Sequence, residues 1–331
     1  REFANYIEIT YLTLCPVAKP NSRVLVCAVV NKEGSYDHYL VKDSKTRAWI
    51  VIYYRSKAMK KQILRSPLFY VGDKYKLMEE IGTYFPDNIG KFVEPFVGGG
   101  SVFMNTVAEQ FCLNDIDGYI IGLHKYLSKS ANKKNAFFAD LERIIKEYGL
   151  SYSCKEDSIP MDLKSLYKKT YFAKYNKKAY EQMRSDFNES SKDNMSILYL
   201  LLIYGFNRML RFNKRGDFNL PVGNVDFNSN VVSALENYFQ EVKNKKPKWY
   251  NLDYKVFLKK IQLSENDFVY LDPPYLITFS EYNKLWNEKD EKELLQILDQ
   301  LNELNIRFAI SNVTHYKDRK NDIFIEWSQK Y

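Results

Sequence analysis

The sequence predicts an α/β protein with a doubly wound, mostly parallel sheet that is interrupted by a long, mainly helical insertion. Short apolar runs ending in glycine or proline alternate with segments of helical spacing, before residue 131 and again after residue 261. Between them, residues 132–260 are rich in lysine, tyrosine and asparagine and show helical spacing without strands. Alternation of strands and helices is typical of a parallel sheet with helical crossovers.

The elements of this sheet follow in chain order. Strands are expected at residues 91–94, 111–115, 268–271 and 307–311, and helices at residues 101–110, 119–127 and 291–304. Ser101 is the expected N-cap of the first helix. Inside the insertion, helices are expected at residues 141–148, 163–187 and 196–209. The insertion therefore separates two halves of one nucleotide-binding sheet.

The first 58 residues differ in texture from the rest and contain no catalytic pattern. Short β-branched and aromatic runs at residues 24–30 and 49–54 favour weak strands. We interpret residues 1–58 as an N-terminal appendage of unknown role, with the functional start near Met59.

The composition indicates which classes of protein this chain can belong to. The 331 residues are 45% hydrophobic, and Lys plus Arg outnumber Asp plus Glu by 49 to 41, a net charge of +8. A basic balance permits a polyanionic partner. No apolar run is long enough for a transmembrane helix. The four cysteines and three histidines are scattered, so we expect neither a disulfide framework nor a metal site, and a reducing compartment such as the cytoplasm.

A glycine-rich turn at residues 94–101 follows the first expected strand of the sheet. Its glycines let the backbone approach a ligand closely, beside the free amides of a helix N-terminus. Asp115 comes 17 residues after Gly98, at the end of the next strand. An acidic residue at that distance accepts hydrogen bonds from ribose hydroxyls in doubly wound folds. Helix capping is the alternative role of Asp115.

Asp272-Pro273-Pro274-Tyr275 directly follows the expected strand at residues 268–271. The prolines stiffen the turn, hold the carboxylate in place and leave the Pro273 carbonyl without a strand partner. Two acceptors beside an aromatic ring suit an exocyclic amine on a planar base whose ring stacks on Tyr275. A rigid loop with a capping aspartate is the structural alternative.

These segments, in this order, resemble the Dam-type DNA adenine-N6 methyltransferases over residues 59–331. The resemblance implies a Rossmann-like methyltransferase sheet that binds S-adenosylmethionine (SAM), with residues 59–131 and 261–331 as the catalytic domain. It implies a target-recognition domain at residues 132–260. The residues expected at the cofactor are Tyr70, Lys74, Glu94, Phe96, Gly98, Gly100, Asp115 and Asp272, and those expected at the target amine are Asp272, Pro273, Pro274 and Tyr275. Tyr70 stands where tryptophan is frequent, and Asp73 replaces the second glycine of the usual G-G-K.

Residues 204–221 gather four basic and four aromatic side chains around a Lys-Arg-Gly-Asp turn. This segment resembles the DNA-reading hairpin of the same family, although a solvated basic turn is an alternative. By resemblance, Arg211 reads a guanine. The expected DNA-binding set is Asn207, Met209, Arg211, Asn213, Lys214 and Pro221. Arg208 stands where glycine is common, and the basic run at residues 243–248 is expected to be a solvated loop.

The implied function is site-specific methyl transfer from SAM to N6 of an adenine flipped out of duplex DNA. A restriction-modification or phage modification system, a separate cognate restriction endonuclease and a G-A-T-containing site fit this resemblance. Cytosine-N4 methylation, guanine-N2 methylation of RNA and a catalytically silent DNA-binding regulator remain alternatives. Family members usually continue beyond the position of Tyr331 with further strands, so we expect the sheet to be incomplete at its C-terminal side.

Overall fold

The computed structural model describes residues 9–16, 23–30, 62–155, 159–278 and 286–331. Met59 and the expected strand at residues 49–54 lie outside these ranges. The expected strand at residues 24–30 is present as β2 (Arg23–Val30), and it pairs with β1 (Ile9–Pro16).

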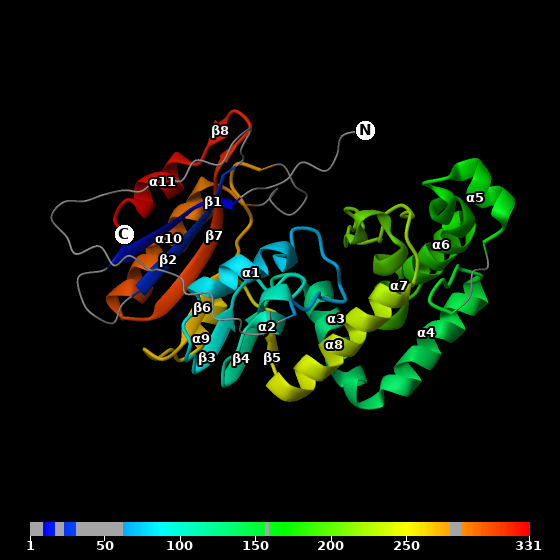
Figure 1. The fold of residues 1–331 in the computed structure, drawn as a ribbon, viewed down its shortest axis with the longest axis horizontal. Coiled ribbons are helices and arrows are strands. Elements are labelled where there is room, and N and C mark those ends of the chain that lie inside the picture. The colour runs from blue at the N-terminus through cyan, green and yellow to red at the C-terminus, as the bar shows by residue number, and fades with distance from the viewer. Residues whose placement is uncertain (1–8, 17–22, 31–61, 156–158, 279–285) are drawn as a thin grey trace.

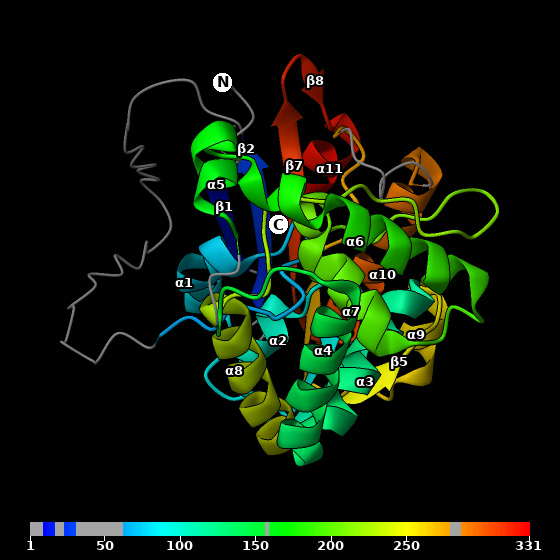
Figure 2. The ribbon, with the colours of Figure 1, turned by 90° about the vertical axis from the view of Figure 1, so that its right-hand side faces the viewer.

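One sheet of eight strands organises the chain (Figures 1 and 2). Its further strands are β3 (Lys91–Glu94), β4 (Gln110–Asn114), β5 (Lys248–Tyr250), β6 (Phe268–Leu271), β7 (Arg307–Tyr316) and β8 (Arg319–Lys320). The strand order is β1-β2-β7-β6-β3-β4-β5, and β8 pairs with β7. All neighbours are parallel except β1 with β2 and β7 with β8. The predicted parallel sheet is therefore confirmed.

Helices cover both faces of the sheet. The α-helices are α1 (Met78–Ile81), α2 (Ser101–Asn105), α3 (Gly118–Ser130), α4 (Lys134–Tyr148), α5 (Met161–Tyr167), α6 (Tyr171–Glu189), α7 (Met195–Tyr204), α8 (Ser229–Lys245), α9 (Tyr254–Lys260), α10 (Glu288–Glu303) and α11 (Asp322–Ser328). Four short 3-10 helices occupy Tyr75–Leu77, Gly82–Tyr84, Ala131–Lys133 and Phe206–Arg208. Within the described ranges, none of the helices has both the length and the apolar character needed to cross a bilayer.

Alternation along the central strands explains why both faces are covered. Phe92 and Phe268 point into one hydrophobic cluster, whereas their neighbours Val93 and Val269 point into another. Successive side chains of a strand face opposite sides, so an unbroken apolar run needs a covering layer on each side. Helices α9, α10 and α11 complete the second cluster, and helices α1 to α4 and α6 to α8 join the first.

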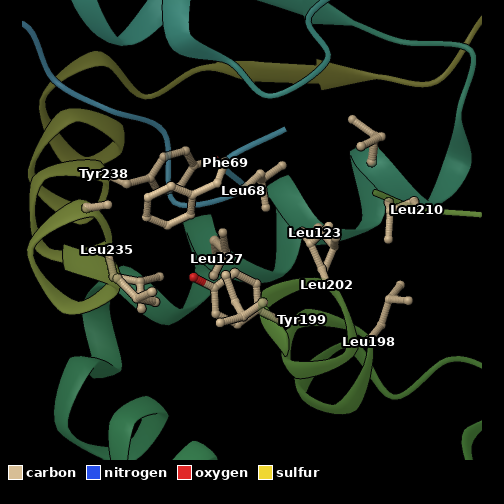
Figure 3. Packing of buried hydrophobic residues seen from close by; sticks show 14 of the residues in the cluster. Leu68, Phe69, Leu123, Leu127, Leu198, Tyr199, Leu202, Leu210, Leu235 and Tyr238 are labelled. Carbon is tan, nitrogen blue, oxygen red and sulfur yellow. The ribbon is translucent and has the colours of Figure 1, made fainter. Parts of the chain in front are cut away.

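Helices α4 to α8 extend beyond the β5 end of the sheet (Figure 1). They share a core with it, because α3 lies between the sheet and the buried helix α7. Figure 3 shows Leu123 and Leu127 of α3 close to Leu198 and Tyr199 of α7. The Tyr199 hydroxyl donates to the Pro67 carbonyl over 3.0 Å. The helical segment is thus packed directly against the chain that leads into the sheet.

Several elements differ from the sequence-based expectations, and one of them is the helix expected at residues 196–209, which ends at Tyr204. Strand β5 lies inside the range expected to be helical and returns the chain to the sheet at Lys248. Helix α2 ends at Asn105, and Gly100, in a left-handed conformation, is its N-cap in place of Ser101. The helix expected at residues 163–187 is broken between α5 and α6, where Lys168 has a φ of 39°. The basic run at residues 243–248 is partly helical, and Lys245 donates to the Phe103 and Met104 carbonyls at the end of α2.

Candidate active site

The glycine turn and the Asp-Pro-Pro-Tyr turn lie side by side. Strands β3 and β6 are parallel neighbours, and one of these turns follows each strand at its carboxyl end. The chain runs from β3 towards β4 and β5, but from β6 towards β7 in the opposite direction. Doubly wound sheets bind ligands in the crevice that forms where the strand order reverses in this way.

Tyr70 lies directly over the glycine turn. A Cβ atom added at Gly99 would lie 2.8 Å from the Tyr70 Cβ, and one added at Gly100 would lie 2.5 Å from the Phe103 ring. Gly100 also has a φ of 79°, which favours glycine. The glycines therefore let Tyr70 and α2 approach the turn closely. The left-handed conformation in the Tyr70–Lys74 segment falls on Gly72, with a φ of 85°, so Asp73 takes the place of a glycine without backbone strain.

Asp115 holds the start of the glycine turn. Its carboxylate accepts hydrogen bonds from the backbone N–H of Gly98 over 2.9 Å and of Asp117 over 3.0 Å. Burial raises the pKa of Asp115 to about 6, although these hydrogen bonds oppose the shift. The N-cap of α3 is Asp117, which accepts from the N–H groups of Tyr119 and Ile120, so the capping alternative for Asp115 is wrong. The neighbouring Ile116 side chain is 69% exposed and adds an apolar surface that the sequence analysis missed.

Lys74 forms an ion pair with Asp272, across 198 positions of sequence. Lys74 also donates to the Gly72 carbonyl over 3.1 Å, and its Nζ lies 5.3 Å from the centre of the Tyr275 ring. Burial by itself lowers the pKa of Lys74, but Asp272, Tyr270 and Asp73 together outweigh burial and the pKa is raised, so Lys74 is a cation. The Tyr275 hydroxyl donates to the other Asp272 oxygen over 2.8 Å. The first predicted cofactor segment is therefore joined to the Asp-Pro-Pro-Tyr turn.

Glu94 is the last residue of β3 and stands at the start of the glycine turn. It is 1% exposed, and its Oε2 has no hydrogen-bond partner among the described residues. Burial raises the pKa of Glu94 well above its usual value, and the nearby negative charge of Asp272 raises it further. A buried carboxyl oxygen without a partner costs free energy. Asp73 Oδ2 and Ser101 Oγ are likewise buried and unpaired, so the site offers polar atoms to a ligand with donors or positive charge.

His124 fixes the other side of the glycine turn. Its Nε2 lies 2.9 Å from the Gly98 carbonyl oxygen and its Nδ1 lies 2.8 Å from the Tyr238 hydroxyl. The ring stacks on Trp249 with centroids 4.4 Å apart and planes 10° apart. Complete burial lowers the pKa of His124 to about 4, so the ring is neutral at pH 7. A neutral ring that donates to Gly98 and accepts from Tyr238 satisfies both nitrogens.

We expect His124 to make the protein acid-sensitive. As the pH falls from 7 to 5, the unfolded chain, with an ordinary histidine pKa near 6.5, takes up a proton that the folded ring, with a pKa of about 4, refuses. The histidine thus contributes stability above pH 6.5 that is lost towards pH 4, about 2 kcal/mol of it by pH 5. Urea unfolding at both pH values measures this loss. His124→Gln, which keeps a donor for Gly98 but does not titrate, is expected to lose about 2 kcal/mol less than the wild type, and equal losses would contradict the assignment.

The predicted DNA-reading segment forms a narrow loop closed by two isolated bridges, Gly205 with Val222 and Phe212 with Phe218. Asn213 accepts hydrogen bonds from the N–H groups of Arg215 and Asp217, and so holds the turn at the tip. Gly216 adopts a φ of 75° there. Of the predicted DNA-binding residues, Asn207, Asn213, Lys214 and Pro221 are exposed, whereas Met209 and Arg211 are half-buried.

Asn219 holds the Arg211 guanidinium. Its side-chain oxygen accepts from Arg211 Nε over 2.8 Å, and its carbonyl oxygen accepts from Nη2 over 2.8 Å. A guanidinium carries five N–H groups, so three donors stay free for a ligand. The sequence analysis named Arg211 but missed Asn219. The feature of the sequence that could have indicated this pair is the spacing of eight residues between Arg211 and Asn219, on opposite sides of the turn.

Two ring contacts join the loop to α3 and to the segment before Tyr70. Phe212 stacks on Tyr119 at the start of α3, with centroids 4.1 Å apart. Arg208 lies 4.0 Å from the centre of the Phe69 ring, one residue before Tyr70. Arg208 has a φ of 49°, a conformation in which glycine is favoured, and the contact with Phe69 helps to offset its strain. The loop thus lies beside the Tyr70–Lys74 segment.

Comparison with known proteins agrees with this arrangement. The family model of D12 class N6 adenine-specific DNA methyltransferases matches residues 70–331. The chain belongs to this family. It is 34% identical to the type II methyltransferase M.FokI of Planomicrobium okeanokoites and 33% identical to the modification methylase StsI of Streptococcus sanguinis, each over 81% of this chain and 38% of the relative. It is 29% identical to the DNA adenine methylase of Escherichia coli, over 75% of this chain and 80% of that protein.

The chain thus spans about two fifths of the length of M.FokI and StsI. The order of the glycine turn, the helical segment and the Asp-Pro-Pro-Tyr turn is what the family resemblance implied. The match begins at Tyr70, so it leaves out β1 and β2.

Proposed function

We propose that this chain transfers a methyl group from SAM to N6 of an adenine in duplex DNA, at a specific site. The observation that carries the proposal is the position of Asp272 and Glu94 at the carboxyl ends of two adjacent parallel strands, where the strand order reverses. Membership of an adenine-N6 family favours this reaction over cytosine-N4 or guanine-N2 methylation. The intact Asp272–Tyr275 turn favours it over a silent DNA-binding regulator.

The site suits SAM on the chemistry of its residues. SAM carries positive charge, ribose hydroxyls and an adenine ring, and when bound it supplies an activated methyl group. The unpaired Glu94 and Asp73 oxygens suit its donors and positive charge, and Asp115 suits its ribose. Phe96, half-buried, forms an aromatic group with Tyr254 and Trp286 beside the glycine turn and suits the adenine ring. Tyr70, Gly98 and Gly100 shape the turn against which the cofactor would lie.

Asp272 and the Pro273 carbonyl are the proposed acceptors of the target amine. Lys74 and Tyr275 each donate to one Asp272 oxygen, but a carboxylate accepts about four hydrogen bonds, so it keeps capacity for an amine N–H. These donors also fix the direction of the carboxylate. An amine held by two acceptors directs its lone pair out of the ring, and positioning of this kind contributes much of a transfer rate. Pro274 keeps Tyr275 rigidly placed beside the base.

Helices α4 to α8 with the loop at residues 204–221 form the proposed target-recognition region. The loop carries Arg211 for a base edge and Lys214 for a phosphate, and Asn207, Met209 and Pro221 would border the bases. The adenine must leave the duplex to reach Asp272, at a cost of a few kcal/mol. The names of the relatives M.FokI and StsI favour a modification role, with a separate restriction endonuclease as the proposed partner and the cytoplasm as the proposed location.

The test is chemical identification of the product. Purified protein is incubated with plasmid and SAM carrying a labelled methyl group, and the DNA is digested to nucleosides. We expect label in N6-methyl-2′-deoxyadenosine, and sequencing of the methylated positions gives the recognition site. Label in N4-methylcytosine, label only in added RNA, or DNA binding without label would each contradict the proposal in favour of one alternative.

A further inference from the structure

A group of lysines lies at the junction of α5 and α6, outside every motif discussed above. We define the α5–α6 lysine patch as Lys168, Lys169, Lys174, Lys177 and Lys178. All five side chains are exposed, and no carboxylate in the described parts of the chain forms an ion pair with any of them. Only Asp162 and Glu181 carry negative charge nearby in the sequence. The patch therefore has a strong local positive charge.

Several other lysines of the helical segment form ion pairs. Lys134 with Glu236, Lys146 with Glu142, and Lys192 with Asp217 all lie within 3 Å. In the patch, by contrast, Lys174 and Lys178 stand one helical turn apart, where like charges are destabilising. A polyanion bound across the patch would remove this repulsion.

Asn224 joins the patch to the predicted DNA-reading loop. Its side-chain oxygen accepts from the Ala173 N–H over 3.3 Å, and its side-chain nitrogen donates to the Lys169 carbonyl. Asn224 comes three residues after Pro221, a chain length of at most about 11 Å. The turn that carries Lys168 and Lys169 is therefore tied to the segment whose Pro221 is expected to border the bases.

Helix α6 runs along the same segment that contains Pro221. Arg184 of α6 donates to the Leu220 carbonyl over 2.9 Å, and Ala173, three turns earlier, contacts Asn224. Lys177 stands seven residues before Arg184, so it lies on the same side of the helix. Figure 1 places α5 and α6 on the same side of the molecule as the loop and away from β1, α9 and α10. The lysines thus extend the surface of the loop.

We propose that the α5–α6 lysine patch binds the phosphate backbone of the DNA that flanks the recognition site. The proposal rests on the proposed function, because the loop has to place a duplex beside Pro221. Duplex DNA carries one phosphate per about 3.4 Å of each strand. The length of chain from Pro221 to Asn224 therefore corresponds to only a few phosphates along the backbone, so the patch lies within reach of the phosphates next to the recognition site. The patch contacts no base, so it adds affinity and footprint without adding sequence discrimination.

The salt dependence of DNA binding tests the patch. The triple variant Lys169→Gln, Lys177→Gln and Lys178→Gln removes charges whose side chains make no ion pair within the described residues. Its matched control, Lys259→Gln, Lys260→Gln and Lys289→Gln, makes the same change of net charge on exposed positions of α9 and α10. Both are compared with the wild type by fluorescence anisotropy on a 40-base-pair duplex of mixed sequence between 50 and 200 mM salt.

We expect the patch variant to lower the salt slope by about 0.9 for each lysine that contacts a phosphate, or about 2.7 for all three. Its affinity would then fall about 40-fold less than that of the wild type over this salt range. The control is expected to change the slope by less than half as much. Base discrimination and the rate at saturating DNA should not change in either variant.

Equal salt slopes for the patch variant and the wild type would overturn the proposed role of the patch. Equal losses of salt slope in both triple variants would overturn it as well, because they would indicate an effect of net charge alone. Tighter binding of the wild type to duplex RNA of the same length, lost in the patch variant, would also overturn it. A wild type that neither binds the DNA duplex nor methylates plasmid would contradict the proposed function instead.

Discussion

Replacing Asp272 with alanine is expected to lower the rate of methyl transfer by at least about 100-fold, while DNA binding stays within a few-fold of the wild type. The carboxylate is the proposed acceptor for one N–H of the target amine, and loss of one positioned electrostatic group typically costs 100-fold to 1,000-fold in rate. Single-turnover transfer of labelled methyl to plasmid measures the rate. A rate above about a tenth of the wild-type value would contradict the role of Asp272.

The control must separate chemistry from folding, because alanine leaves the buried Lys74 ammonium without its partner. An unpaired buried charge costs about 3–5 kcal/mol of stability. The double variant Lys74→Gln with Asp272→Asn removes both charges and keeps a polar side chain at each position. If this variant melts near the wild-type temperature and still fails to transfer methyl groups, the loss belongs to the chemistry. Recovery of transfer in the double variant would indicate that Asp272 serves only to neutralise Lys74.

The central sheet could be predicted from the sequence because its strands are short apolar runs with a clear end. Strand β6 has the predicted bounds, and β3 and β4 agree to within one residue. Strand β5 could not be predicted, since three residues that follow a basic helix end carry no alternation of their own. It forms because β4 offers an open edge at Cys112–Asn114.

The sequence indicated those candidate site residues that stand directly at the end of an expected strand, as Asp115 and Asp272 do. Contacts between distant parts of the chain were not predicted. The Lys74–Asp272 pair joins positions 198 residues apart, and His124 reaches Gly98 from the middle of α3. Such contacts depend on how helices pack on the sheet, and no local pattern records that packing. The left-handed backbone of Phe69 and Arg208, with φ of 48° and 49°, is equally invisible in the sequence.

Replacing Arg211 with alanine is expected to reduce discrimination at a single base pair by about 5-fold to 150-fold, or 1–3 kcal/mol. The expected contact is bidentate, from the guanidinium to the acceptors of a guanine edge. Asn219 occupies two of its five donors and thereby holds the planar group in one orientation. The measurement is kcat/KM on duplexes that carry each single-base change of the site found by sequencing the methylated plasmid.

Two further variants separate base reading from charge. Asn219→Ala keeps the guanidinium but removes one of its two fixed acceptors, so we expect a smaller loss of discrimination at the same base pair. Arg215→Ala removes a neighbouring exposed charge of the same turn, so we expect weaker binding to all sequences and a salt slope lower by about 0.9. If Arg211→Ala behaves like Arg215→Ala, with a uniform loss across the panel, Arg211 is a phosphate contact. A loss confined to one base pair, shared in part by Asn219→Ala, requires a guanidinium held in place before the DNA arrives.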